Sequence, residues 1–416
     1  MAETTAPDRY RLVPQVLDGV EIRVFADAPT SMRELLVATA TFGDGDFLVS
    51  GDERLTYGEH FDRVAGLAVR MRDVYGVRHG TRVAIAMRNH VEWVIAFWAT
   101  QALGAVSVPL NACSRSSASR ASCCCTWTSE WAARSCCSTS GTSTTPSGCS
   151  SARRVTAFSA VPTILRSLLS SPKLDAHDLS SLTSLAAGAA PVPADLLARM
   201  GSLRDGVGVA RLRNHRGDGR VVVNAGAGVV DHPTSVGRPL PMIDVRIVDP
   251  ETGFDRPQGD AGEIWFKGPN VIRGYWNDPA ADAASFVDGW FRSGDLGYLD
   301  DEGLLFVVDR LKDVIIRGGQ NIYCAEVEVA IGACPGVDDV AVLGLAHPTL
   351  GEEVAAVVVV ALADEHGVSA DVLRTVLAGR LAAYKVPAVF VLRHDPLPRT
   401  ATGKVLKRQL RDEPSP

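Results

Sequence analysis

Residues 289–328 read GWFRSGDLGYLDDEGLLFVVDRLKDVIIRGGQNIYCAEVE and carry the most informative pattern in the chain. Within them, the apolar run at 304–308 predicts a strand and residues 325–331 predict a helix. The same reasoning predicts further elements on both sides: strands at 262–266, 339–343 and 354–360, and a helix at 369–381. The carboxyl-terminal part is therefore predicted to be a regular α+β module.

A second string, PRTATGKVLKRQL, follows at residues 398–410. Together the two strings closely resemble the signature of acyl-CoA synthetases and related adenylate-forming enzymes. AAGAAP at 186–191 and GEIWFKGPNVIRGYWNDP at 262–279 support the resemblance. It implies an α/β fold in which a large adenylation domain of βα sheets plus a barrel, incomplete here, occupies residues 1–308. A small α+β lid domain is then expected at 309–416.

The resemblance also implies the chemistry: a carboxylate is joined to AMP, pyrophosphate leaves, and the acyl group passes to the thiol of CoA. ATP, Mg²⁺ and CoA are the expected cofactor and co-substrates. Asp295 is expected to accept hydrogen bonds from both ribose hydroxyls, which requires two acceptor oxygens on a short side chain. Arg310 adds a permanent cation near the same nucleotide. An isolated Asp or Arg would be read as a turn or surface residue, but their place inside a long match favours a function.

Five further residues receive roles from the resemblance. The backbone of Gly188, Ala189 and Ala190 is expected beside the adenine ring. Lys404 is expected to bridge the substrate carboxylate and the α-phosphate, where a preorganised cation stabilises developing negative charge. Lys312 matches the hinge about which the lid domain rotates, since such rotations concentrate dihedral changes on few residues.

Gly318 and Gly319 are expected on the thioester-forming face, where glycine allows close approach of the pantetheine arm. A plain turn is the alternative, because paired glycines are common in turns.

The amino-terminal region has its own clear signals. Thr56 and Glu59 have the spacing of a capping box, and apolar residues recur after them at helical intervals up to Met71. A strand at 83–87, a helix at 90–103 and a strand at 105–110 predict a βαβ unit and hence a parallel sheet. A strand within 155–162 and a helix at 164–169 are also expected.

Residues 113–153 break this regularity, because they are rich in Ser, Cys, Thr and Arg and have neither strand nor helix periodicity. Pairing the third base of each codon with the first two of the next permits G-G and L near 131–137, and D-D-A-V-R-L-L-E-R-E from 143 to 152. The amino-acid sequence encoded in that shifted frame is similar to the one that the family carries before its VTAFSAVP-like strand. The stretch is therefore read as frame-shifted. It holds seven of the nine cysteines, namely Cys113, Cys123, Cys124, Cys125, Cys136, Cys137 and Cys149.

A metal cluster is the alternative for these cysteines, since thiolates bind soft metals. Adjacent cysteines, however, lack the C-x-x-C spacing usual for zinc, so no metal ligands are assigned.

A second aberrant segment runs over residues 209–220. The opposite frame shift at 212–219 permits S-E-T-T-G-V-T-V, which is similar to the family segment whose glutamate holds Mg²⁺. Arg213 occupies that glutamate's codon, and arginine cannot coordinate a cation. The string TSGTSTTPSG at 139–148 imitates a phosphate loop but lacks its lysine. The chain as written is therefore expected to be inactive, a remnant that at most binds nucleotide or a partner protein.

Composition and charge limit the partners. The formal charge of −6 and the sequence pI near 5.9 do not suggest nucleic acid as a partner. The longest apolar run, at 354–363, is too short to span a bilayer, so a cytoplasmic protein without a membrane span is expected. The expected partners are ATP, CoA and a carboxylic acid that is fatty or otherwise hydrophobic. Aryl and bile-type acids and a luciferase-like oxidation remain alternatives, and the sequence assigns no oligomeric state.

Overall fold

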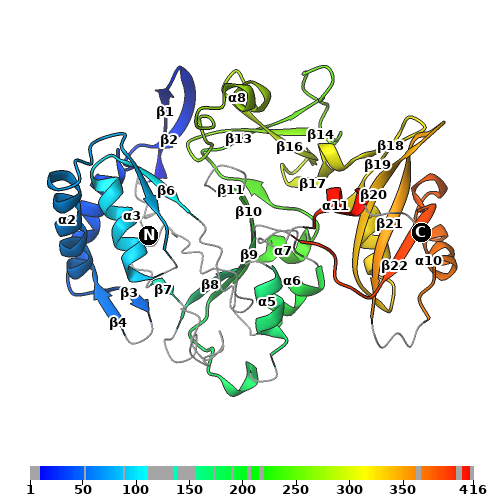
Figure 1. The fold of residues 1–416 in the computed structure, drawn as a ribbon, viewed down its shortest axis with the longest axis horizontal. Helices are drawn as coiled ribbons and strands as arrows, with labels where there is room; N and C mark the ends of the chain where they lie inside the picture. The colour runs from blue at the N-terminus through cyan, green and yellow to red at the C-terminus, as the bar shows by residue number, and fades with distance from the viewer. Residues whose placement is uncertain are drawn as a thin grey trace, which may run out of the picture. The chain divides into compact units, whose positions relative to one another are not determined.

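The chain divides into two compact units in the computed structural model. Figure 1 labels their helices and strands. The first comprises residues 1–15, 23–213 and 224–233, and the second comprises 16–22, 214–223 and 234–416. The structure describes residues 10–50, 53–87, 90–110, 135–137, 155–160, 162–171, 174–188, 192, 194–203, 208–214, 220–361, 367–399 and 405–412.

The first unit begins with helices packed around a small sheet. α2 (Tyr57–Asp73) starts at the predicted capping box: Thr56 Oγ1 accepts from the Glu59 amide at 3.1 Å, and the Glu59 carboxylate accepts from the Thr56 amide at 3.0 Å. This pair satisfies amides that have no partner within the helix. Leu55, Val64 and Ala99 are completely buried in the core that α2 and α3 share. The neighbouring elements are β1 (Leu12–Leu17), β2 (Val20–Phe25), α1 (Met32–Thr39), η2 (Ala40–Phe42), β3 (Asp46–Ser50) and β4 (Glu53–Thr56).

The predicted βαβ unit is confirmed. β5 (Arg82–Ile85) and β6 (Val106–Pro109) pair in parallel, and α3 (Val91–Ala102) connects them. β7 (Ser135–Cys137) pairs in parallel with β3. It is the described part of the 113–153 stretch, and the rest of that stretch lies outside the described residues.

Three further strands of the first unit, β8, β9 and β10, lie next to one another in that order and pair in parallel. The strand and helix expected after residue 154 are confirmed as β8 (Ala157–Ala160) and α5 (Pro162–Leu169). Leu165, Leu185 and Leu196 are buried in the core beside this sheet. The remaining elements are η3 (Leu174–Ala176), β9 (Ser184–Gly188), α6 (Ala194–Gly201), β10 (Gly208–Asn214) and α7 (Ala227–Asp231).

The second unit contains an antiparallel sheet that positions the candidate site. Its strand order is β13, β14, β16, β15, and β17 pairs with the other part of β16. Ile264, Phe266 and Leu305 are fully buried on this sheet. The elements of this region are β13 (Asp244–Val248), β14 (Gly262–Lys267), α8 (Pro279–Ser285), β15 (Phe286–Val287), β16 (Trp290–Leu299) and β17 (Leu305–Arg310). β11 (Arg220–Ala225) and β12 (Arg238–Pro239) pair with each other in antiparallel fashion and are not strands of this sheet.

The carboxyl-terminal part of the second unit is the predicted α+β module. Its sheet has the order β19, β18, β21, β20, with β22 parallel to β21. The long apolar strand β21 is buried over residues 354–360, with α9 and α10 supplying apolar residues to one core cluster. The elements are η4 (Leu311–Asp313), β18 (Ile315–Arg317), β19 (Gln320–Ile322), α9 (Cys324–Gly332), β20 (Val337–His347), β21 (Gly351–Val360), α10 (Ala370–Ala378), η5 (Ala383–Lys385), β22 (Val389–Arg393) and α11 (Lys407–Asp412).

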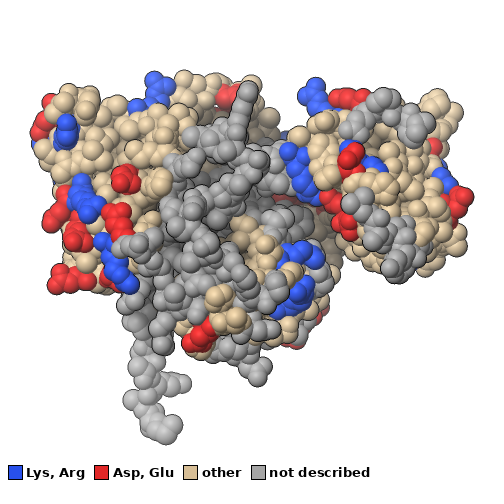
Figure 2. All heavy atoms as spheres, turned by 60° about the horizontal axis from the view of Figure 1, so that its bottom comes forward, with Lys and Arg blue, Asp and Glu red and all other residues tan. Residues whose placement is uncertain are grey.

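Charged side chains of the described residues are mixed by sign. On the face that Figure 2 draws, patches of Lys and Arg lie beside patches of Asp and Glu. Some of these opposite charges form ion pairs at the surface, such as Arg54–Asp46 at 2.7 Å and Arg63–Glu53 at 3.2 Å. Each such pair contributes about 0–1 kcal/mol to the stability of the fold. In the parts of the chain that the structure describes, no helix has both the length and the apolar character needed to cross a membrane.

Candidate functional site

Asp295 and Arg310 lie opposite each other on neighbouring antiparallel strands. They are direct Cα partners of β16 and β17, and Arg310 Nε lies 3.5 Å from Asp295 Oδ1. The Asp295 side chain is only 5% exposed, whereas that of Arg310 is 38% exposed. A buried carboxylate requires a cation or hydrogen-bond donors nearby. The structure thus brings together the two residues that are predicted from the sequence to contact the nucleotide.

The backbone around Asp295 is kinked and held by side chains. Gly294 has φ +68°, a left-handed conformation that favours glycine. Ser293 Oγ accepts from the Asp295 amide at 3.0 Å, while the Gly294 amide donates to Glu263 Oε1 at 3.0 Å. A register irregularity of the β16–β17 pair follows at once, between Leu296 and Gly297. These features fix the direction in which the Asp295 side chain leaves β16.

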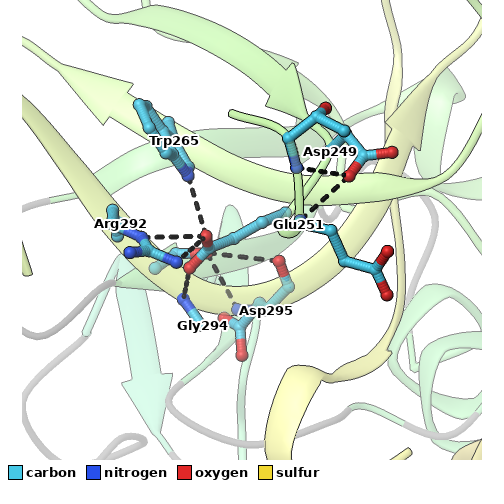
Figure 3. A network of polar contacts seen from close by, with 9 residues as sticks. Asp249, Glu251, Trp265, Arg292, Gly294 and Asp295 are labelled. Atoms are coloured by element: carbon cyan, nitrogen blue, oxygen red, sulfur yellow. Dashed lines mark hydrogen bonds and ion pairs between the residues drawn. The ribbon is translucent and has the colours of Figure 1, made fainter. Parts of the chain in front are cut away.

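Glu263, for which the sequence predicted no role, accepts hydrogen bonds from Trp265, Arg292 and Gly294, the three residues that Figure 3 labels around its carboxylate. It lies in β14 and is 2% exposed. Its Oε2 accepts from Trp265 Nε1 at 2.9 Å and from Arg292 Nε at 3.1 Å, and Arg292 Nη2 is 3.0 Å away. The available signal was a glutamate inside an apolar strand, because a buried acid is almost always paired.

The segment that follows Arg310 connects the site to the carboxyl-terminal module. Lys312, the predicted hinge, lies exposed in the short turn η4. On its amino-terminal side Asp309 accepts from the Arg310 amide at 2.7 Å, and its other oxygen accepts from the Ala325 amide of α9 at 3.2 Å. Burial raises the pKa of Asp309 above its ordinary value, although the two amides oppose this shift. Asp309 therefore links residues on either side of Lys312.

Gly318 and Gly319 form the tip of the β18–β19 hairpin. Arg317 and Gln320 are Cα partners, so the two glycines are a two-residue turn, with φ +57° and φ +80°. Positive φ at both central positions is the geometry of a type I′ hairpin turn. Both glycines are exposed, and the Gly318 amide donates to the Leu350 carbonyl at 2.8 Å. The turn alternative thus describes their geometry, and a role toward CoA stays a proposal.

A partly buried cluster of polar groups connects α9, α11 and the turn η4. Lys407 Nζ is 2.8 Å from Glu328 Oε1, which also accepts from the Val342 amide at 2.9 Å. Burial is the largest single influence and lowers the pKa of Lys407, but Glu328, Cys324 and Asp313 together raise it, so the net direction is upward. Burial raises the pKa of the Cys324 thiol to about 12, and its Sγ donates to the Asp313 carbonyl at 2.9 Å. No role was predicted for these residues from the sequence.

The other predicted site residues are only partly placed. Gly188 ends β9, where it pairs with Leu212 of β10. Ala189, Ala190 and Lys404 lie outside the described residues, as does the phosphate-loop-like string at 139–148. Arg213, at the codon of the expected Mg²⁺ ligand, belongs to β10. Among the residues that can be described, no group of three or more His, Cys, Asp or Glu could hold a metal ion.

Two family models match the sequence. The model described as AMP-binding enzyme matches residues 37–125 and 118–276, and the model described as AMP-binding enzyme C-terminal domain matches residues 326–404. The two segments of the first match overlap at 118–125, inside the Ser- and Cys-rich stretch. Asp295 and Arg310 lie between the two models.

Curated relatives include a feruloyl-CoA synthase from Amycolatopsis sp, 43% identical over 261 residues, which is 62% of this chain and 52% of the relative. A long-chain-fatty-acid–CoA ligase from Bacillus subtilis is 38% identical over 266 residues, 62% of this chain and 45% of the ligase. The chain thus spans about half the length of the curated relatives it matches.

Solved structures show the same fold. An o-succinylbenzoate CoA synthetase from Bacillus subtilis, in complex with its acyl-adenylate intermediate, has a TM-score of 0.75 and 25% identity, over 93% of this chain and 99% of that one. ATP-bound MatB from Rhodopseudomonas palustris has a TM-score of 0.79 and 23% identity, over 92% of this chain and 98% of that one. The overall α/β architecture expected from the sequence is therefore confirmed.

Proposed function

The chain belongs to the AMP-binding enzyme family, and on that premise we propose that its activity is the ATP-dependent ligation of a carboxylic acid to CoA through an acyl-adenylate. The observation that carries this proposal is the buried Asp295 opposite Arg310, on strands between the two segments that the family models match. In this role Asp295 accepts from the ribose hydroxyls and Arg310 supplies positive charge beside the nucleotide.

The lid domain is part of the proposal. We place its start at residue 309, supported by the C-terminal model match over 326–404 and by the regular module that begins with β18. Lys404 would be the cation at the α-phosphate and Lys312 the hinge. Rotation about Lys312 would change the 3.2 Å contact between Asp309 and the Ala325 amide, because these residues flank the hinge. Gly318 and Gly319 would then approach CoA.

For the chain as written we propose nucleotide binding without turnover. The sequence supports this, because Arg213 occupies the codon expected for the Mg²⁺ glutamate and TSGTSTTPSG lacks the phosphate-loop lysine. The break of the family match near residue 120 also supports an interruption there. Loss of one preorganised electrostatic contact costs roughly a hundred- to a thousandfold in rate, and several would be lost together. Sequencing the gene through the codons for residues 112–221 tests the interruption directly.

The substrate proposed is a hydrophobic carboxylic acid, with ATP and Mg²⁺ required and CoA as acceptor. Relatives named for a long-chain fatty acid and for feruloyl-CoA support both an aliphatic and an aryl class. A panel of fatty, aryl and amino acids should be assayed with protein expressed from a gene in which the reading frame is restored and the adenylation domain is complete. Exclusive use of an amino acid would contradict the CoA-ligase proposal. We propose a cytoplasmic location because ATP and CoA are supplied there.

A further inference from the structure

We propose that Glu263 is a positioning residue for the ribose-binding carboxylate: it holds the Gly294 amide and thereby sets the direction of Asp295. The inference rests on the proposed function, since it assigns a role within the same nucleotide site. Glu263 lies in β14, about thirty positions before Asp295 in sequence, and its side chain accepts from the amide of Gly294 in β16, which Figure 3 labels.

The two oxygens of the Glu263 carboxylate have different partners. Oε2 is held by Trp265 Nε1 at 2.9 Å and by Arg292 Nε at 3.1 Å. Oε1 accepts from the Gly294 amide at 3.0 Å. One oxygen is thus fixed on the sheet, and the other acts on the residue before Asp295. A charged acceptor makes a stronger hydrogen bond than a neutral one.

The site of this contact is the point where β16 departs from regular geometry. The Cα partner of Glu263 is Leu296, and the β14–β16 register shifts between Glu263 and Trp265. A regular strand would direct the Gly294 amide toward the backbone of a neighbouring strand. Because Gly294 has φ +68°, its amide instead points to the Glu263 carboxylate. The carboxylate therefore satisfies a partly buried amide that the left-handed conformation of Gly294 takes out of the ladder. Without that acceptor, we expect residues 293–295 to relax and Asp295 to turn away from the ribose.

A purely structural role would predict a different pattern of effects. If Glu263 only stabilised the sheet, its loss would weaken every nucleotide equally. If it acts through Asp295, its loss should weaken only nucleotides that carry ribose hydroxyls. AMP and 2′,3′-dideoxy-AMP differ in those hydroxyls alone, so the ratio of their affinities isolates the proposed role.

The test uses the full chain with Glu263→Gln, whose amide keeps the size of the side chain but removes its charge and one acceptor. Binding of AMP and dideoxy-AMP is measured by isothermal titration calorimetry. We expect AMP affinity to fall roughly tenfold to a hundredfold, as for loss of a charged hydrogen bond, with dideoxy-AMP affinity changed less than about threefold. The control is Asp255→Asn, an exposed acid paired with Arg246 at 2.7 Å, which should change neither affinity.

A second variant keeps the test decisive if Glu263→Gln does not fold. Gly294→Ala leaves the buried carboxylate intact, and a Cβ there meets no atom within 4 Å, but the left-handed backbone becomes strained. It should show the same loss confined to AMP. Equal losses for both nucleotides, or no loss in either variant, would overturn the positioning role alone. Wild-type protein that bound neither nucleotide would instead overturn the proposed function and this role with it.

Discussion

Arg310 lies directly opposite Asp295 in the β16–β17 ladder, with its Nε 3.5 Å from a carboxylate that is almost completely buried. Hydrogen-bonded strands fix this relationship, so the pair does not depend on a flexible loop. A buried acid beside a partly exposed arginine can receive polar ligand groups from one side while its charge is balanced from the other.

Asp295→Asn should selectively weaken AMP binding. The amide has one acceptor oxygen instead of two, so it cannot accept from both ribose hydroxyls. We expect AMP affinity to fall about ten- to a hundredfold in calorimetric titrations, with little change for 2′,3′-dideoxy-AMP. Asp255→Asn is the matched control. Wild-type affinity for AMP in Asp295→Asn would refute the ribose role.

His60 should make the first unit sensitive to acid. It is 1% exposed, its ring lies 4.3 Å from that of Phe47, and neither ring nitrogen has a hydrogen-bond partner among the described residues. Burial lowers the pKa of His60 to about 4. The folded state therefore binds fewer protons than the unfolded state between the ordinary pKa of 6.5 and about 4, and stability is lost as pH falls through that window.

His60→Phe should remove this pH dependence. The stability lost between pH 7 and pH 4 should be smaller in the variant by about 3 kcal/mol. Urea unfolding across this pH range, followed by tryptophan fluorescence, measures the difference. Identical pH profiles for the two proteins would show that His60 is not held neutral in the fold.

Cys324 should be unreactive in the native protein. It is 1% exposed, and burial raises the pKa of its thiol to about 12 from an ordinary value of 9.0, so the reactive thiolate is scarce at pH 8. Treatment with iodoacetamide followed by peptide mass spectrometry should leave Cys324 unlabelled. The same protein in urea is the control and should be labelled there. Rapid native labelling would contradict the packing of α9.

Lys407→Met should destabilise the carboxyl-terminal module by about 1–3 kcal/mol, because it leaves Glu328 without its cation in a partly buried position. The Lys407 and Glu328 side chains are 19% and 28% exposed. The double variant with Glu328→Gln should recover part of the loss in a double-mutant cycle measured by urea unfolding. Additive losses would show that the two charges do not interact.

Local signals in the sequence predicted local structure well. The Thr56–Glu59 capping box begins α2 because both of its hydrogen bonds involve residues three positions apart. The apolar run at 354–360 predicted β21 because it is buried on both sides. The predicted strand at 339–343 was too short, since β20 continues to His347 by pairing with polar residues of β21 that carry no hydrophobic pattern.

The site was predicted only where family resemblance reached it. Asp295 and Arg310 were identified in this way, and the ladder brings them together. Glu263 was missed because its role depends on Gly294, about thirty positions away, and on a register irregularity that the sequence does not show. The roles of Ala189, Ala190 and Lys404 lie outside the described residues and remain predictions.

The most direct test of the central claim is acid-dependent exchange of pyrophosphate into ATP by the purified chain of 416 residues. The exchange reports adenylation alone and requires no CoA. We predict AMP binding that depends on Asp295, together with exchange no greater than that of the Asp295→Asn variant for any acid tested. Exchange above that background, dependent on a hydrophobic carboxylic acid, would contradict the account and assign a working phosphate site to the chain as written.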